Sequence, residues 1–433
     1  MFKFLLPAPH LPEIADPDVV KSTYKYWRMR VMVTMFVGYM FYYFTRKGFI
    51  FVMPGIMQEL HLDKSQVGMV GTIYALVYGL SKFFNGILSD QSNPRYFMGL
   101  GLICTGILNI CVGFSSSLFF LALFWGLNGW FQGCGWPPCV RLLTHWYSRS
   151  ERGSWWSSVS VSQNVGAFLI PWIVGGVQQF FGWRTGICTP GIICIFGGFF
   201  LMYRLADTPQ SVGLPPMRGE KHEEQELSSR QLLASVLKNK SIWTLAIVYF
   251  FIYFIRSGVE QWTALFLIES KGYAQISASG VVSLFEAGGF VGGLSAGWIS
   301  DRLFRARRGP VNVLFALLLI IALISFWAMP EGSAWLASSL LFTIGFASFG
   351  PQLLIGIAVA ELVHKKASAT ANGFAGWVAY FGGASAGFPL GKAIDKLGWE
   401  GFFYSMVIAS GVAIALLLVN LREKKSYIVG SSQ

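Results

Sequence analysis

Charged residues are scarce in this chain, at 12% of 433 residues, whereas 54% of the residues are hydrophobic. A soluble globular domain carries about 25% charged residues, so the composition excludes an ordinary soluble protein. Histidine is scarce too, with five residues, and none lies deep in an apolar run. The six cysteines show no metal-ligand spacing with a histidine. We therefore expect a membrane protein with no metal site and no cofactor.

The formal net charge is nevertheless +12. In a soluble protein such an excess would indicate nucleic-acid binding. Here the cations lie mostly in short loops between apolar runs, which is typical of the cytoplasmic loops of membrane proteins. The charge therefore favours a lipid bilayer as partner and argues against nucleic acid.

Twelve apolar runs are long enough to cross a bilayer as helices, because about 20 residues span the hydrocarbon core. They lie at about 28–57, 65–88, 96–114, 118–141, 154–180, 184–204, 241–268, 276–299, 310–329, 334–361, 368–391 and 398–421. The sequence therefore predicts an all-α integral membrane protein with twelve transmembrane helices in two six-helix halves.

The hydrophilic segments divide the chain into domains. We expect a cytoplasmic lead at 1–27, an N-terminal six-helix bundle at 28–204, a central cytoplasmic linker at 205–240, a C-terminal six-helix bundle at 241–421 and a cytoplasmic tail at 422–433. The linker side of the predicted membrane carries 24 of the 33 lysines and arginines, the opposite loops carry 5, and 4 lie within apolar runs. This bias predicts that both termini are cytoplasmic.

The two halves repeat each other. Gly86–Asp90 after the second run matches Gly297–Asp301 after the eighth. The pair Gly182-Trp183 before the sixth run matches Gly398-Trp399 before the twelfth, and Arg46 in the first run matches Arg256 in the seventh. Parallel repeats of this kind place a substrate site at the interface of the halves, near the membrane midplane.

Arg46 and Arg256 are charges inside apolar runs. A charge near mid-membrane costs at least roughly 2.5–3.5 kcal/mol, so such residues usually face a cavity and have a function. A structural arginine that caps a helix or pairs with an acid is the alternative. Their matching positions in both halves favour the functional interpretation.

The repeated glycine-to-aspartate segments are each followed by basic residues, Arg95 in the first copy and Arg302 with the cluster 305–308 in the second. This pattern resembles the loop signature of the major facilitator superfamily. Longer stretches make the whole chain resemble the organophosphate:phosphate antiporter family, and within it the hexose-phosphate branch of glucose-6-phosphate transporters and sensors. These stretches are Tyr43–Lys47, Gly79–Phe83, Gly135–Cys139, Asp207–Pro215, Phe285–Gly289 and Phe349–Gly356.

The resemblance implies that Arg46 and Arg256 bind the phosphate together, and guanidinium groups do match phosphate oxygens bidentately. Lys47 and Lys82 are the other cations within apolar runs. The resemblance implies that Lys82 lines the route of the phosphate. The alternative is that its side chain extends the ammonium group to the membrane surface. For Lys47 both roles stay open.

Glu260 and Glu286 are the matching acids within apolar runs. Buried cations need partners when a site is empty, so we interpret these acids as counter-charges that the phosphate displaces. Permanent pairing of Glu260 with Arg256, without any gating, is the alternative. The resemblance also implies that Asp90 with Arg95, and Asp301 with Arg302, form cytoplasmic latches.

Aromatic and amide side chains near the arginines are candidates for contact with a sugar. They are Tyr42, Tyr43, Trp136, Gln132, Tyr253, Trp262, Asn164 and Gln352. Gln163 stands where members of the family often carry a histidine. Glutamine donates hydrogen bonds but does not titrate near neutral pH, which argues against proton coupling through this position.

The resulting hypothesis is a secondary transporter in a bacterial inner membrane that exchanges hexose 6-phosphate, with glucose 6-phosphate foremost, for inorganic phosphate by alternating access. We expect a monomer. A receptor that binds external hexose phosphate and signals to a membrane partner is the alternative, because both activities need the same pocket. No nucleophile or metal constellation indicates an enzyme.

Overall fold

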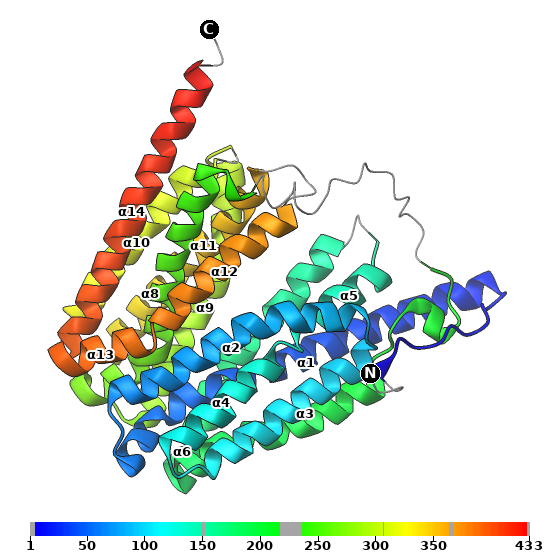
Figure 1. The fold of residues 1–433 in the computed structure, drawn as a ribbon, viewed down its shortest axis with the longest axis horizontal. Helices are drawn as coiled ribbons and strands as arrows, with labels where there is room; N and C mark the ends of the chain where they lie inside the picture. Colours follow the sequence, from blue (N-terminus) through cyan, green and yellow to red (C-terminus); the bar gives the residue numbers. More distant parts are fainter. Residues whose placement is uncertain (1–4, 149–151, 217–235, 306, 363–367, 431–433) are drawn as a thin grey trace. The chain divides into compact units, whose positions relative to one another are not determined.

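The apolar runs fold into long helices. The computed structural model describes residues 5–148, 152–216, 236–305, 307–362 and 368–430, and this part of the chain contains no strand (Figure 1). The chain forms two compact units. Unit 1 comprises Met1–Leu60 and Val77–Glu223, and unit 2 comprises His61–Leu76 and Glu224–Gln433.

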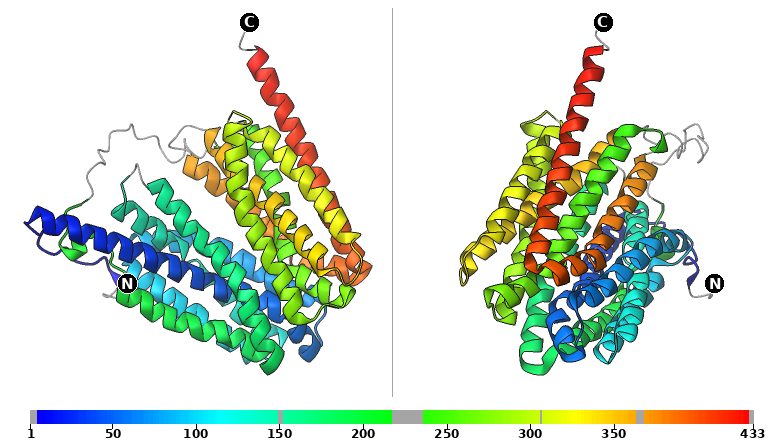
Figure 2. Two further views of the ribbon diagram at one scale, coloured as in Figure 1. Left: turned by 180° about the vertical axis from the view of Figure 1, so that it is seen from behind. Right: turned by 60° about the vertical axis from the view of Figure 1, so that its left-hand side comes forward.

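Unit 1 is built on α1, α3 and α6, and both α1 and α3 pack along α6 (Figures 1 and 2). Its helices are α1 (Pro17–Leu60), the later part of α2 (Lys64–Asp90), α3 (Pro94–Gly113), α4 (Leu118–Gln132), α5 (Trp136–Trp146), α6 (Arg152–Arg204) and the short 3-10 helix η2 (Pro209–Val212).

In unit 2, α9 packs most extensively against α11, and α12 and α14 pack against α8. Its helices are α8 (Lys240–Lys271), α9 (Gln275–Arg302), α10 (Arg308–Trp327), α11 (Ala334–Glu361), α12 (Ser368–Ser385), α13 (Phe388–Leu397) and α14 (Trp399–Gly430). The first turns of α2 belong to unit 2. There the Thr72 hydroxyl donates to the Ala384 carbonyl at 2.8 Å.

Glycines allow α9 and α11 to approach closely. A Cβ atom on Gly288 would overlap the Phe342 carbonyl, and one on Gly345 would overlap the Phe285 carbonyl. Small residues serve this purpose between membrane helices, because they bring the two backbones into contact.

Each predicted apolar run coincides, to within two residues, with a helix, a part of a helix or a broken pair of helices. The run at 118–141 is divided between α4 and α5, and the run at 368–391 between α12 and α13. The two runs on either side of Gly182 are joined in α6, which is broken at that glycine by a φ of 79°. Eight helical segments of the described residues are long and apolar enough to cross a membrane.

Capping residues explain where several helices begin and end. The Asn93 side chain accepts from the Arg95 amide at 3.1 Å, with Pro94 in the first helical position of α3. The Asn239 side chain caps the start of α8 in the same way, and the end of α8 is capped by Gly272, whose φ of 68° is in the left-handed region. Asparagine and glycine are favoured at these two ends because they satisfy the backbone groups left free there.

Candidate functional site

In unit 1, Arg46 projects from α1 toward α4. Its Nε donates to the Gln132 Oε1 at 3.2 Å. Its guanidinium carbon lies 4.5 Å from the ring centroid of Tyr43 and 4.6 Å from that of Tyr78. A guanidinium is attracted to the face of an aromatic ring. The half-buried charge is therefore held by an amide oxygen and two ring faces.

Gln132 is itself firmly held. It is 1% exposed, and its amide nitrogen donates to the Tyr42 carbonyl at 3.1 Å and to the Thr45 hydroxyl at 2.9 Å. Both acceptors lie within one turn of Arg46 on α1. The side chain predicted to contact a sugar thus links α4 to the backbone that carries the arginine.

Lys82 meets the same aromatic ring as Arg46. Its Nζ lies 5.1 Å from the ring centroid of Tyr78, which is 5% exposed and four residues earlier on α2. Two cations therefore converge on one ring in unit 1. Lys47 is 8% exposed on α1, and its role stays a prediction.

Tyr43 joins the arginine to α6. Its hydroxyl donates to the Gln163 Oε1 at 2.9 Å. Trp136, at the start of α5, extends the aromatic surface, because its ring lies 5.0 Å from that of Tyr39, which in turn lies 5.7 Å from that of Tyr43. Asn164 is half-buried next to Gln163. The structure thus groups Tyr43, Gln163 and Trp136 near Arg46.

In unit 2, Arg256 projects from α8 toward α11. Its Nη1 donates to the Gln352 Oε1 at 2.8 Å. Its guanidinium carbon lies 4.1 Å from the ring centroid of Phe349 and 5.8 Å from that of Tyr253. The Gln352 amide nitrogen is 3.4 Å from the Tyr253 hydroxyl, to which it donates.

The two units therefore repeat one arrangement. In each, an arginine on the first helix of its half lies near a tyrosine three residues earlier and is bound by a glutamine, Gln132 on α4 or Gln352 on α11. The sequence repeat predicted the arginines but not the pairing with glutamine. Neither Tyr78 nor Phe349 was predicted as a site residue, although Tyr78 stands at the i, i+4 spacing from Lys82 that brings side chains together on a helix.

The two acids lie on α8 and α9. Glu260 is half-buried one turn after Arg256, and Glu286 is 6% exposed. Their gating role stays a prediction. Trp262 is fully buried, and its indole nitrogen donates to the Ala386 carbonyl at 2.8 Å. This is the geometry of a packing residue, and its contact with a sugar likewise stays a prediction.

The predicted latches pair Asp90 with Arg95 and Asp301 with Arg302. The side chain of Asp90 lies outside the described residues. The Arg95 Nε donates to the Met202 carbonyl. Asp301 pairs with Arg308, which also binds Glu361 at 3.3 Å, and Arg302 is exposed. The two latches remain predictions.

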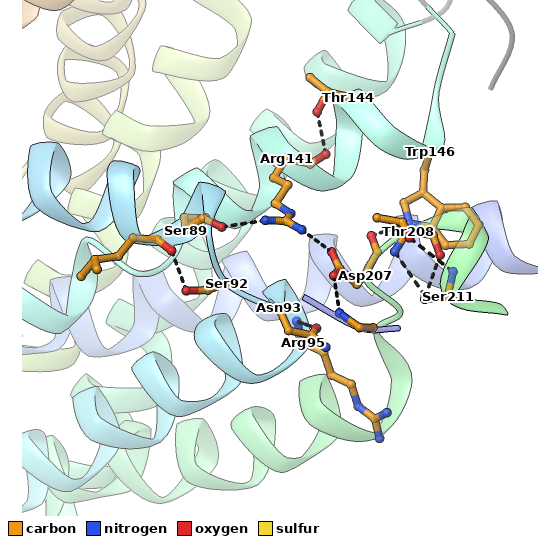
Figure 3. Close-up of polar contacts among 12 residues, drawn as sticks. Ser89, Ser92, Asn93, Arg95, Arg141, Thr144, Trp146, Asp207, Thr208 and Ser211 are labelled. Carbon is orange, nitrogen blue, oxygen red and sulfur yellow. Dashed lines mark hydrogen bonds and ion pairs between the residues drawn. The ribbon is translucent and has the colours of Figure 1, made fainter. Parts of the chain in front are cut away.

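The sequence did not predict the buried ion pair between Arg141 and Asp207. Arg141 in the middle of α5 binds the Asp207 carboxylate at 3.0 Å, and the two side chains are 9% and 1% exposed (Figure 3). Arg141 also donates to the Ser89 carbonyl at 3.3 Å. The other carboxylate oxygen of Asp207 accepts from the Ala8 amide at 3.0 Å. The pair thus ties the end of α2, α5, the N-terminal lead and the segment after α6 together.

Known proteins resemble this chain over nearly its whole length. The Major Facilitator Superfamily profile matches residues 35–387. A probable hexose phosphate transport protein of Chlamydia pneumoniae is 51% identical over 98% of this chain and 98% of its own. The membrane sensor protein UhpC of Salmonella typhimurium is 44% identical over 96% and 97%. The glycerol-3-phosphate transporter of Bacillus subtilis is 37% identical over 98% and 99%.

A solved structure supports the same fold. A bacterial homologue of the human lysosomal transporter Spinster matches with a TM-score of 0.76 at 17% identity, over 92% of this chain and 97% of that one. The predicted all-α membrane fold is confirmed. The chain is thus a multi-pass integral membrane protein that belongs to the Major Facilitator Superfamily, in its organophosphate:phosphate antiporter branch.

Proposed function

We propose that this protein exchanges hexose 6-phosphate for inorganic phosphate across a bacterial inner membrane. The observation that carries the proposal is the repeated arginine arrangement, Arg46 with Gln132 in unit 1 and Arg256 with Gln352 in unit 2. The printed name of the Chlamydia pneumoniae relative supports hexose phosphate as the substrate class.

Arg46 and Arg256 both bind the phosphate group in this proposal. Guanidinium groups form charge-assisted, bidentate hydrogen bonds with phosphate oxygens, and they remain charged at any pH of interest. Neutral amide oxygens and aromatic rings contact both arginines. Aromatic faces and amides such as Tyr43, Trp136 and Gln163 suit the sugar.

Obligatory exchange follows from the charge of the site. The substrate anion neutralises both arginines, so the loaded protein changes conformation more easily than the empty one. Alternating access then carries one anion in each direction. We propose a monomer with both termini cytoplasmic, acting as a transporter and not as an enzyme.

Reconstituted liposomes test this proposal. Purified protein is placed in liposomes loaded with radiolabelled phosphate, and glucose 6-phosphate, glycerol 3-phosphate or buffer is added outside. We expect efflux with glucose 6-phosphate and none with buffer. Arg46→Lys and Arg256→Lys should each reduce the exchange rate at least about 100-fold, because lysine has no bidentate edge. Full exchange in both variants would refute the proposed role of the arginines.

A sensor is the second candidate, favoured by the 44% identity to a membrane sensor protein. A sensor binds the sugar phosphate and passes the signal to a membrane partner without net exchange. Saturable binding of glucose 6-phosphate to the purified protein, together with no efflux from the loaded liposomes, would replace the transporter with this second function.

Glu286 is the best candidate for a counter-charge, because it is a carboxyl group 6% exposed in the same unit as Arg256. If a carboxylate balances the arginines when the site is empty, Glu286→Gln should slow exchange about ten-fold or more while the protein remains folded. The measurement is efflux from liposomes, with the melting temperature as the check on folding. Unchanged exchange would contradict the gating role.

A further inference from the structure

We propose that Arg30 and Arg204 bind the phosphate group of an anionic phospholipid at the linker-side boundary of the membrane. Both residues belong to unit 1, where α1 and α6 pack along each other. The membrane-spanning part of α6 ends at Arg204, and the first predicted apolar run begins at about residue 28. Both arginines therefore stand at the depth of the lipid headgroups. Binding of this lipid does not depend on the proposed exchange.

Arg30 covers the end of α6. Its Nε donates to the Arg204 carbonyl at 3.0 Å, and its Nη2 donates to the Tyr203 carbonyl at 3.2 Å. The Arg95 Nε donates to the preceding carbonyl, that of Met202. Cations commonly bind the carbonyl groups that a helix leaves free at its C-terminus. Capping of α6 is therefore the alternative to a ligand site.

Capping does not use all the donors of Arg30. A guanidinium group carries five N–H bonds. Three of them are used, two for the carbonyls of α6 and one, from Nη1, for the Tyr26 hydroxyl at 2.8 Å. The two that remain, one on each Nη atom, have no hydrogen-bond partner among the residues that the structure describes. They can donate to the oxygens of a phosphate group.

In the described part of the chain, no ion pair joins Arg30 or Arg204 to a carboxylate. The Arg204 guanidinium lies 5.6 Å from the ring centroid of Phe200, and its Nε is buried without a described hydrogen-bond partner. The Arg30 guanidinium lies 4.7 Å from the ring centroid of Trp27 and 5.9 Å from that of Tyr203. A buried donor without a partner is costly, and an anion would satisfy it.

Exposed apolar side chains lead from these arginines along both helices. They are Tyr26, Met29 and Val33 on α1, and Phe196, Phe199 and Tyr203 on α6. In each set the spacing is i, i+3, i+7, which places the side chains on one face of the helix. Such a surface suits acyl chains, and tyrosine is enriched at the membrane boundary. The site therefore fits a lipid and not a free phosphate.

The charge of the site favours an anionic lipid over a zwitterionic one. Phosphatidylcholine carries an ammonium group that the arginines repel, whereas phosphatidylglycerol carries only the negative phosphate. Basic pockets between membrane helices on the cytoplasmic side bind anionic headgroups, and each arginine near an anionic surface contributes about five-fold in affinity.

Native mass spectrometry of the delipidated full-length protein tests the site, with phosphatidylglycerol and phosphatidylcholine as probes at equal concentration. We expect the wild type to bind phosphatidylglycerol more tightly. Its affinity should fall about five-fold in Arg30→Gln and in Arg204→Gln, while that for phosphatidylcholine stays the same. Equal affinity of the wild type for both lipids, or unchanged phosphatidylglycerol binding in both variants, would overturn the proposed site.

Arg184→Gln is the matched control. Arg184 also caps a helix, because it donates to the Gly113 carbonyl at the end of α3 and to the Ser115 carbonyl. Its charge, however, is paired with Glu59 at 2.8 Å. This variant should keep the wild-type affinity for phosphatidylglycerol. An equal loss in Arg184→Gln and Arg30→Gln would show an effect of capping alone and overturn the proposed site.

Arg204→Gln keeps the site testable if Arg30→Gln does not fold, because the Arg204 side chain makes no hydrogen bond within the described residues. Inorganic phosphate separates a lipid from a free anion. Any rise in melting temperature that it causes should be the same in the wild type and in both variants. A rise that the variants lose would identify a soluble anion as the ligand. A dimer without bound phosphatidylglycerol would show that a second copy covers the exposed face. Either result would overturn the lipid site.

Discussion

At the scale of single residues, the two half-buried arginines are bound by neutral groups. Arg46 is bound by the Gln132 oxygen and lies over the rings of Tyr43 and Tyr78. Arg256 is bound by the Gln352 oxygen. Amide oxygens and ring faces stabilise a guanidinium group but carry no net negative charge.

Glu59, after the first predicted apolar run, provides a pH-dependent prediction. Hydrogen bonds from Arg184, at 2.8 Å, and from Trp183 hold the pKa of Glu59 below its usual value of 4.5. A carboxyl group with a lowered pKa contributes stability that is complete above its usual pKa and is lost as the pH falls through the lowered value.

We therefore expect Glu59→Gln to lower the melting temperature slightly at neutral pH. The effect should stay below about 1 kcal/mol, because both partners are more than one-third exposed. The difference between variant and wild type should shrink toward zero as the pH falls below the lowered pKa. Melting curves in detergent between neutral and acidic pH measure it, and a difference that does not vary with pH would contradict the assignment.

At the scale of helices, one turn recurs in both halves. Gly182 and Gly398 both have a positive φ, at 79° and 65°. The tryptophan after each glycine donates to a glutamate near the end of the first helix of its half, Trp183 to Glu59 at 2.6 Å and Trp399 to Glu269 at 3.1 Å. The repeated Gly-Trp pair therefore has a physical reason. Only glycine readily adopts this backbone, and the indole N–H then connects the turn to a neighbouring helix.

The buried pair of Arg141 and Asp207 connects several segments of unit 1, so its loss should destabilise the protein. Asp207→Ala leaves the Arg141 charge buried without its carboxylate, at a cost of about 3–5 kcal/mol. The double variant Arg141→Met with Asp207→Ala should recover part of this loss. Asp301→Ala is the control, since that carboxylate is 61% exposed beside Arg308. Thermal unfolding in detergent measures all three variants, and an equal, small effect of Asp207→Ala and Asp301→Ala would contradict this role.

At the scale of the whole molecule, the distribution of cations predicts the orientation in the membrane. Of the 33 lysines and arginines, 24 lie on the linker side of the predicted membrane and 5 on the opposite side. A green fluorescent protein fused to the C-terminus should therefore fluoresce, because it folds in the cytoplasm, and an alkaline phosphatase fused there should be inactive. Active phosphatase with no fluorescence would reverse the predicted topology.

The sequence by itself determined the helical class, the family and the two central arginines. These depend on composition, on the length of apolar runs and on a repeat of about 210 residues, all of which are visible along the chain. The break of α6 at Gly182 lies between two predicted runs, whereas the breaks within 118–141 and 368–391 were not predicted.

Only the tertiary structure decided what holds each arginine. Gln132 lies 86 residues from Arg46, and Gln352 lies 96 residues from Arg256. No local pattern connects residues so far apart, because their contact depends on how α4 packs on α1 and how α11 packs on α8. The same holds for Arg141 and Asp207, 66 residues apart. Composition and periodicity identify which residues are unusual in a membrane, whereas helix packing decides which of them bind each other.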